Sequence, residues 1–163
     1  MRLCPETCPV IMAHEPVASN AIVDGSKAIS LKNAAGVLIL VTEWTAGADT
    51  DLVLTVHEGA TAAGAVAGST PITTDAEFPI WVNADCATSD VMVRQTDAIT
   101  YTIDATAATI YLVAFYIPAA ILTEGYPWVS LGTSGGNASN LVSVVYILDG
   151  ARYQQETPPT AIE

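Results

Sequence analysis

Three apolar segments between Thr109 and Tyr153 constrain the fold more than any other part of the chain. They read TIYLVAFYI, YPWVSL and LVSVVYILDGARY, and they are rich in β-branched and aromatic residues. A PAAILTEG break and a loop of Gly, Ser and Asn separate them. Buried strands of antiparallel sheets have this composition, with turn signals of this kind between them. We therefore expect three core strands in this stretch.

Shorter segments of the same kind precede these strands. The Asp24-Gly25 pair between residues 17–23 and 27–32 is a hairpin signal. In LVLTVH, which begins at Leu52, apolar side chains recur at every second position, so we expect a half-buried strand with His57 on its polar side. A nearly continuous apolar run predicts a buried strand at 37–44, and further strands are expected at 78–83, 91–95 and 98–104.

Regularly spaced short strands without a long helix predict an all-β protein. The expected architecture is a β-sandwich with a jelly-roll or related Greek-key topology, formed by residues 17–153 as a single domain. The Ala- and Gly-rich residues 59–70 predict a loop or a short helix, and Pro118 can start a single helical turn. With 163 residues, 51% of them hydrophobic, the chain can bury a core.

Proline-containing segments are expected to flank this domain. Pro5, Pro9 and Pro16 interrupt a short apolar run, and proline cannot donate a backbone hydrogen bond, so residues 1–16 are predicted to form an extended N-terminal arm. The polar, Pro-containing residues 154–163 predict an extended C-terminal tail. Apolar residues in such an arm pack either on their own domain or on a neighbouring subunit.

The charge balance limits the partners that we expect. With 17 acidic and 5 basic residues the formal net charge is −12, which repels nucleic-acid backbones and anionic lipid surfaces. A neutral or basic partner fits this charge, although acidity can also serve only to keep an apolar surface soluble. The start MRLCPETCPV lacks the apolar core of a signal peptide, and the apolar window 105–122 is too interrupted for a membrane span, so we expect a soluble protein without a membrane partner.

No catalytic or metal-binding constellation is apparent. Residues 132–136 match the G-x-S-x-G elbow, but a strand-like segment follows where the elbow needs a helix, so Ser134 is expected in a glycine-rich hairpin loop. Cys4, Cys8 and Cys86 do not combine with a histidine pair of zinc-site spacing. Cys4 and Cys8 could form a local disulfide or stay as thiols. We therefore expect a non-enzymatic protein with no cofactor and no metal.

The second half of the chain resembles a known family. The order LVLTVHEGATAAGAVAG, TYTIDATAATIYLVAFYIPAAIL and GYPWVSLGTSGGNASNLVSVVYILDGARYQQETPPTAI is similar to small virion structural proteins of tailed bacteriophages, of the head decoration or cement type. The resemblance covers residues 50–163 and implies a protein made in the host cytoplasm and placed on the outer surface of the capsid. There it would bind the major capsid protein, bridge capsid subunits and form a homo-oligomer, most simply a trimer.

This resemblance gives the arm and tail a role. Apolar and proline side chains there become candidate contacts with the capsid or with a neighbouring subunit: Leu3, Pro5, Pro9, Val10, Ile11, Met12, Pro158, Pro159 and Ile162. The alternative is an all-β receptor- or glycan-binding module of a phage tail or head fibre. An exposed Trp81 or Trp128 beside Asp and Asn side chains would favour that alternative, whereas we expect the tryptophans to pack in the core or in an interface.

Overall fold

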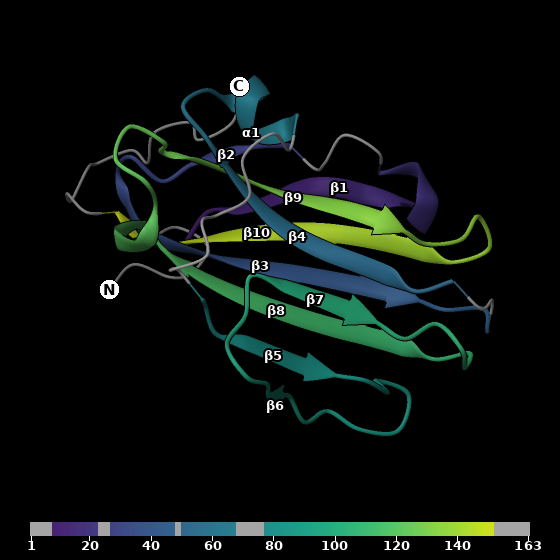
Figure 1. Cartoon of the computed structure of the whole chain (residues 1–163). Helices are drawn as coiled ribbons and strands as arrows, with labels where there is room; N and C mark the ends of the chain where they lie inside the picture. The colour runs from purple at the N-terminus through teal and green to yellow at the C-terminus, as the bar shows by residue number, and fades with distance from the viewer. Residues whose placement is uncertain (1–7, 23–26, 48–49, 68–76, 152–163) are drawn as a thin grey trace.

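Two antiparallel sheets packed against each other form the computed structural model (Figure 1), which describes residues 8–22, 27–47, 50–67 and 77–151. The six-stranded sheet has the order β1 (Val10–Ala18), β10 (Leu141–Ala151), β3 (Ala34–Trp44), β8 (Ile110–Pro118), β5 (Ile80–Asn83), β6 (Val93–Arg94). The four-stranded sheet has the order β2 (Ile29–Ser30), β9 (Trp128–Gly135), β4 (Leu52–Gly59), β7 (Thr100–Ile103). The expected all-β sandwich is thereby confirmed at the level of two packed sheets.

One apolar core lies between the sheets. Every second residue of a strand points inward, so β3 contributes Val37, Ile39 and Val41, and the facing strands contribute their own alternating set. Tyr146 of β10 crosses the core, and its hydroxyl accepts a hydrogen bond of 2.9 Å from the Leu131 amide of β9. This bond ties the two sheets together at the centre of the sandwich.

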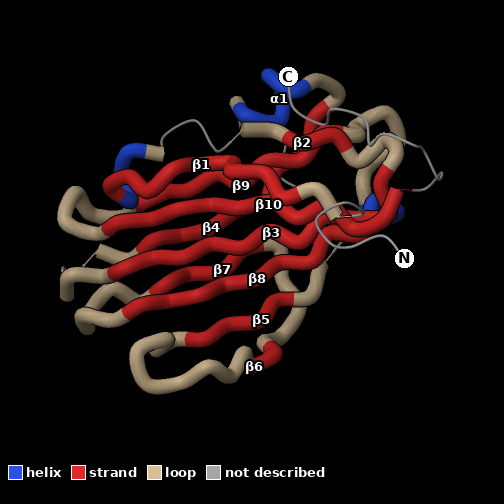
Figure 2. Tube along the Cα trace, turned by 180° about the vertical axis from the view of Figure 1, so that it is seen from behind, coloured by secondary structure: helices blue, strands red, loops and turns tan. Residues whose placement is uncertain are grey.

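Consecutive strands change sheet along most of the chain. Strands β1, β3, β8 and β10 belong to the larger sheet, and β2, β4, β7 and β9 belong to the smaller one. The exception is the pair β5 and β6, which follow each other at one edge of the larger sheet. The three C-terminal strands expected from the sequence are therefore present but divided, with β8 and β10 flanking β3 and with β9 in the opposite layer (Figure 2).

The N-terminal region differs from the prediction. Residues 10–16 of the expected arm belong to β1, an edge strand that pairs with β10. Proline is compatible with an edge strand: Pro9 uses its carbonyl to accept from the Leu148 amide at 3.0 Å, and register shifts accompany the segment around Pro16. The predicted hairpin over 17–32 is wrong, because β1 and β2 lie in different sheets. Residues 1–7, 23–26 and 152–163 lie outside the described residues.

The remaining connections contain short helical segments. A helix, α1 (Ala62–Val66), forms within the Ala- and Gly-rich stretch, and the Thr61 hydroxyl caps it by accepting from the Gly64 amide at 3.1 Å. A 3₁₀ turn, η1 (Ser19–Ala21), follows β1, and another, η2 (Ala119–Ile121), follows Pro118 as expected. Residues 132–135 do not form a hairpin loop: they are the end of β9, and the next strand lies in the other sheet.

Candidate interaction surface

An apolar row crosses the outer side of the six-stranded sheet. Residues directly opposite each other in an antiparallel ladder point to the same side. The register of the six-stranded sheet therefore aligns one residue from every strand on the face that points away from the core: Met12, Val145, Leu40, Ala114, Trp81 and Arg94. Five of the six are apolar, where a sheet with one side in water normally alternates to polar residues.

Neighbouring rows extend this surface along the strands. The next row aligns Val10, Ile147, Leu38 and Tyr116. On the other side, a mixed row of Ser143, Thr42, Leu112 and Asn83 separates the first row from a further apolar row of Leu141, Trp44 and Ile110. Four side chains are about half exposed: Val10 at 54%, Met12 at 52%, Leu141 at 47% and Trp44 at 45%. We call the whole set the apolar face: Val10, Met12, Leu38, Leu40, Trp44, Trp81, Ile110, Leu112, Ala114, Leu141, Val145 and Ile147.

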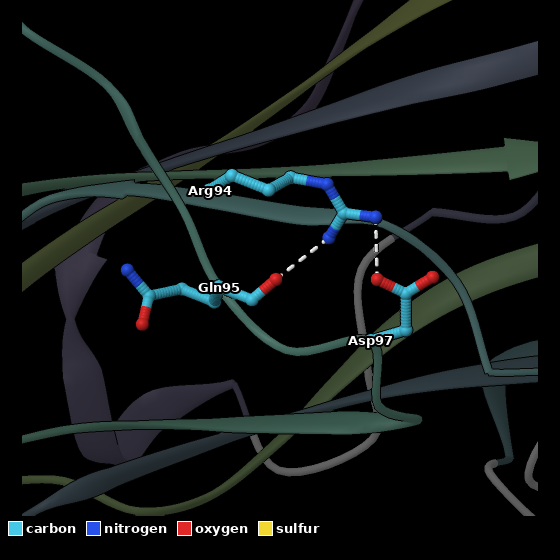
Figure 3. Close-up of polar contacts among 3 residues, drawn as sticks. All are labelled: Arg94, Gln95 and Asp97. Carbon is cyan, nitrogen blue, oxygen red and sulfur yellow. Dashed lines mark hydrogen bonds and ion pairs between the residues drawn. The ribbon is translucent and has the colours of Figure 1, made fainter.

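Polar contacts mark two margins of the apolar face. At the β6 edge the Arg94 guanidinium lies 5.0 Å from the centroid of the Trp81 ring. The same guanidinium pairs with Asp97 and donates to the Gln95 carbonyl at 2.8 Å (Figure 3). At another margin the Tyr116 hydroxyl donates to Asp149 at 2.6 Å, and this hydrogen bond raises the pKa of Tyr116. These charged groups thus lie at margins of the apolar face, which is otherwise aliphatic and aromatic and is crossed by the polar side chains of Thr42 and Ser143.

The outer side of the four-stranded sheet has a different chemistry. Its register places Thr55 opposite Gly132 and Thr100, and places His57 opposite Ser130. His57 lies on this side as expected, packed over Gly132, where an added Cβ would overlap the imidazole ring. Its Nδ1 has no hydrogen-bond partner among the described residues, and burial lowers the pKa of His57. Only one of the two outer sheet faces is therefore built largely from apolar side chains.

Two buried carboxyl groups differ in their hydrogen bonding. Glu58 accepts hydrogen bonds from the Thr123 amide at 2.9 Å and from the Thr123 hydroxyl at 2.5 Å. Glu43, on β3, is fully buried, and neither of its oxygens makes a well-formed hydrogen bond. Burial raises the pKa of Glu43 from 4.5 to about 7, even though Ser19 and Asn140 beside it act in the opposite direction.

The candidate contacts predicted from the sequence are only partly placed. Val10 and Met12 lie on the apolar face, Ile11 packs against the core, and Pro9 precedes β1. Leu3, Pro5, Pro158, Pro159 and Ile162 lie outside the described residues. Sequence reasoning missed the contributions of β3, β8 and β10. The signal was present in the runs 37–44 and 110–117, which are apolar on both sides of the strand, as strands covered on both faces are.

The structure also bears on three other features: metal sites, a nucleophile elbow and membrane-spanning helices. Within the described part of the chain, no group of three or more His, Cys, Asp or Glu side chains could hold a metal ion. Ser134 pairs with Val53 inside the ladder between β9 and β4, which is not the strand-to-helix turn of a nucleophile elbow. No helix among the described residues is long and apolar enough to cross a membrane.

Comparison of the chain with protein-family models, curated proteins and solved structures found no match. The chemistry of the apolar face is therefore the main guide to function.

Proposed function

We propose that the protein is a non-enzymatic decoration, or cement, protein that binds the outer surface of a phage head and bridges capsid subunits. The observation that carries this proposal is the apolar face on the six-stranded sheet. An apolar sheet face with four half-exposed large side chains, Val10, Met12, Trp44 and Leu141, and with charged residues at its margins is typical of a protein-binding site. The resemblance of residues 50–163 to small phage virion proteins gives the class of partner, the major capsid protein.

Charge supports a basic partner rather than a second copy on the apolar face. The net charge of −12 makes two copies repel each other at long range, whereas a capsid surface with basic groups would attract the protein. Asp97, paired with Arg94, and Asp149, which accepts from Tyr116, lie at two margins of the apolar face, and their negative charges support a partner with basic groups there. Trimers formed around a symmetric position of the capsid through other surfaces would add the strength of several weak contacts.

We also propose that the sandwich is a jelly roll. The orders β1-β10-β3-β8 and β2-β9-β4-β7 support this topology, because a jelly roll divides eight strands between two four-stranded antiparallel sheets. In this interpretation β5 and β6 are an insertion between β4 and β7 that widens one sheet. Jelly rolls occur in viral capsid proteins and in lectins.

The glycan-binding alternative is favoured by one observation, the exposure of Trp44. Its cross-strand neighbours are Leu141 and Ile110, which offer no hydrogen bonds to a sugar. The ring of Trp81 is covered by the guanidinium of Arg94, which occupies the position that a stacked sugar would take. The surroundings of both tryptophans therefore give more support to a protein partner than to a glycan.

The proposal is tested by counting and locating this protein in purified virions of the phage that encodes it. Many copies distributed over the head, seen by quantitative mass spectrometry and cryo-electron microscopy, are the expected result. A few copies at the tail would support the receptor- or glycan-binding alternative. Absence from the virion would overturn both. The mass of the free protein and of the capsid-bound form then tests the trimer.

A further inference from the structure

Glu43 occupies an unusual position for a carboxyl group. It lies on β3 between Thr42 and Trp44, whose side chains point outward, so its own side chain points into the sandwich. It is fully buried, and neither oxygen has a well-formed hydrogen bond. The neighbouring Asn140 is also fully buried, and its Nδ2, although close enough to Glu43 to lower the pKa of that carboxyl group, makes no well-formed hydrogen bond with any described residue. Buried polar atoms without partners are rare in proteins and call for an explanation.

The polar groups around Glu43 form hydrogen bonds with the connecting segments. The Ser19 hydroxyl, in η1, donates to the Asn137 carbonyl at 3.1 Å and accepts from the Asn137 amide at 2.9 Å. Asn140 accepts from the Ala46 amide through Oδ1 at 2.9 Å, and its carbonyl accepts from the Ser19 amide at 2.9 Å. These bonds join η1, the 136–140 connection and the end of β3 into one cluster that covers Glu43.

Within the described part of the chain, no cation compensates a negative charge on Glu43. The residues opposite Glu43 in the sheet are Val142 of β10 and Tyr111 of β8. The acidic Asp51, just before β4, adds to the effect of burial in raising the pKa of Glu43. Burial, followed by the charges of Asp104 and other acidic groups including Glu43, raises the pKa of Tyr111. Among the described residues, no basic group acts on Glu43, so the folded arrangement favours the neutral acid.

This cluster lies directly behind one end of the apolar face. Trp44 is the residue after Glu43, Leu141 is the residue after Asn140, and these two apolar residues are paired across β3 and β10. Opening of the cluster would move the backbone on both sides of that pair. Because Glu43 is bonded to Trp44 and Asn140 is bonded to Leu141, ionisation of Glu43 can change the shape of this end of the apolar face.

We propose that Glu43 is a proton-linked switch: when it ionises, η1 and the 136–140 connection open, and the Trp44–Leu141 end of the apolar face loses its order. The role of this switch in regulation rests on the proposed function: if the protein binds capsids, binding is strongest when Glu43 is protonated. The sign follows from linkage. A carboxyl group that is easier to protonate in the closed state stabilises that state at low pH, and this stabilisation is lost as the pH rises through its folded-state value.

The test is hydrogen exchange of the isolated protein between pH 5 and pH 8, followed by mass spectrometry and corrected for the intrinsic exchange rates. With a pKa that changes from 4.5 in the open state to about 7 in the closed state, opening of η1 and the 136–140 connection is expected to increase about 70-fold over this range. Glu43→Gln should remove the pH dependence. The matched control is Glu58→Gln, which alters the other buried glutamate and should leave the pH dependence in these segments intact.

A second measurement keeps the proposal open to refutation if Glu43→Gln does not fold. Titration of the Glu43 carboxyl carbon in the wild-type protein by NMR should have its midpoint near neutral pH. A midpoint near the ordinary value of 4.5, or a pH dependence of exchange that persists in Glu43→Gln, would overturn the switch. Because these experiments use no capsid, their failure is distinct from a failure to find the protein on virions.

Discussion

Replacing Met12 by Gln tests whether the apolar face is the binding surface. Met12 is 52% exposed, so roughly half of the ~1.5–3 kcal/mol gained by burying a methionine, about 1 kcal/mol, remains to be gained on binding. Burying an unpaired Gln amide costs a further ~1–3 kcal/mol. The variant should therefore bind capsids weaker by about 2–4 kcal/mol, or about 30- to 900-fold. Net charge and long-range attraction do not change.

The assay is co-sedimentation of the variant with capsids that lack the protein, over a range of concentrations. Val91→Gln is the matched control, because Val91 is 61% exposed and lies in the connection between β5 and β6, at the opposite edge of the six-stranded sheet from Met12. Thermal unfolding should show that both variants stay folded, since Met12 belongs to an edge strand and is half exposed. Wild-type affinity for Met12→Gln, or an equal loss for Val91→Gln, would refute the assignment of this surface.

Three predictions concern stability and are measured by chemical denaturation. Gly59→Ala should lower the free energy of unfolding by about 1–3 kcal/mol, because the new Cβ would overlap the backbone of Ala65 in α1; an unchanged value would show that α1 moves freely. Tyr146→Phe should lower it by about 1 kcal/mol through loss of the bond to the Leu131 amide, and a neutral effect would contradict that bond. Between pH 5 and pH 8, the free energy of unfolding of Glu43→Gln should rise by about 2.5 kcal/mol relative to that of the wild type, because the raised pKa of Glu43 makes the wild type lose stability as the pH rises. Parallel pH profiles of the two proteins would argue against this prediction.

The strands were largely predictable from the sequence, and their pairing was not. Alternation around Leu54 identified β4, and the apolar run after Gly36 identified β3, because the two-residue period is a local property. The Asp24-Gly25 signal failed because a turn dipeptide does not determine whether the next strand joins the same sheet or crosses to the other. β1 differs from the extended arm that its prolines predict, because an edge strand tolerates prolines that a central strand does not.

The apolar face could not be predicted from the sequence, because its residues come together only through the register of the six-stranded sheet. Val10, Leu38 and Ile147 are far apart in sequence, and only the ladders through β10 bring them into one row. The buried position of Glu43 had a sequence signal that was not used. It falls on the same alternation as Val41, which points into the core, so an inward carboxyl could have been inferred once the strand was recognised.

The place of β10 between β1 and β3 has a consequence for biosynthesis. β10 is the last described strand along the chain, yet it is the hydrogen-bonding partner of the first, with Val10 opposite Ile147. On the ribosome, β1 and one edge of β3 must wait for it, with their backbone groups unpaired and prone to join other chains. Contacts between such distant segments also make folding slow. The larger sheet therefore closes only as a late, whole-chain event, and a fragment ending before Leu141 is expected to aggregate instead of folding.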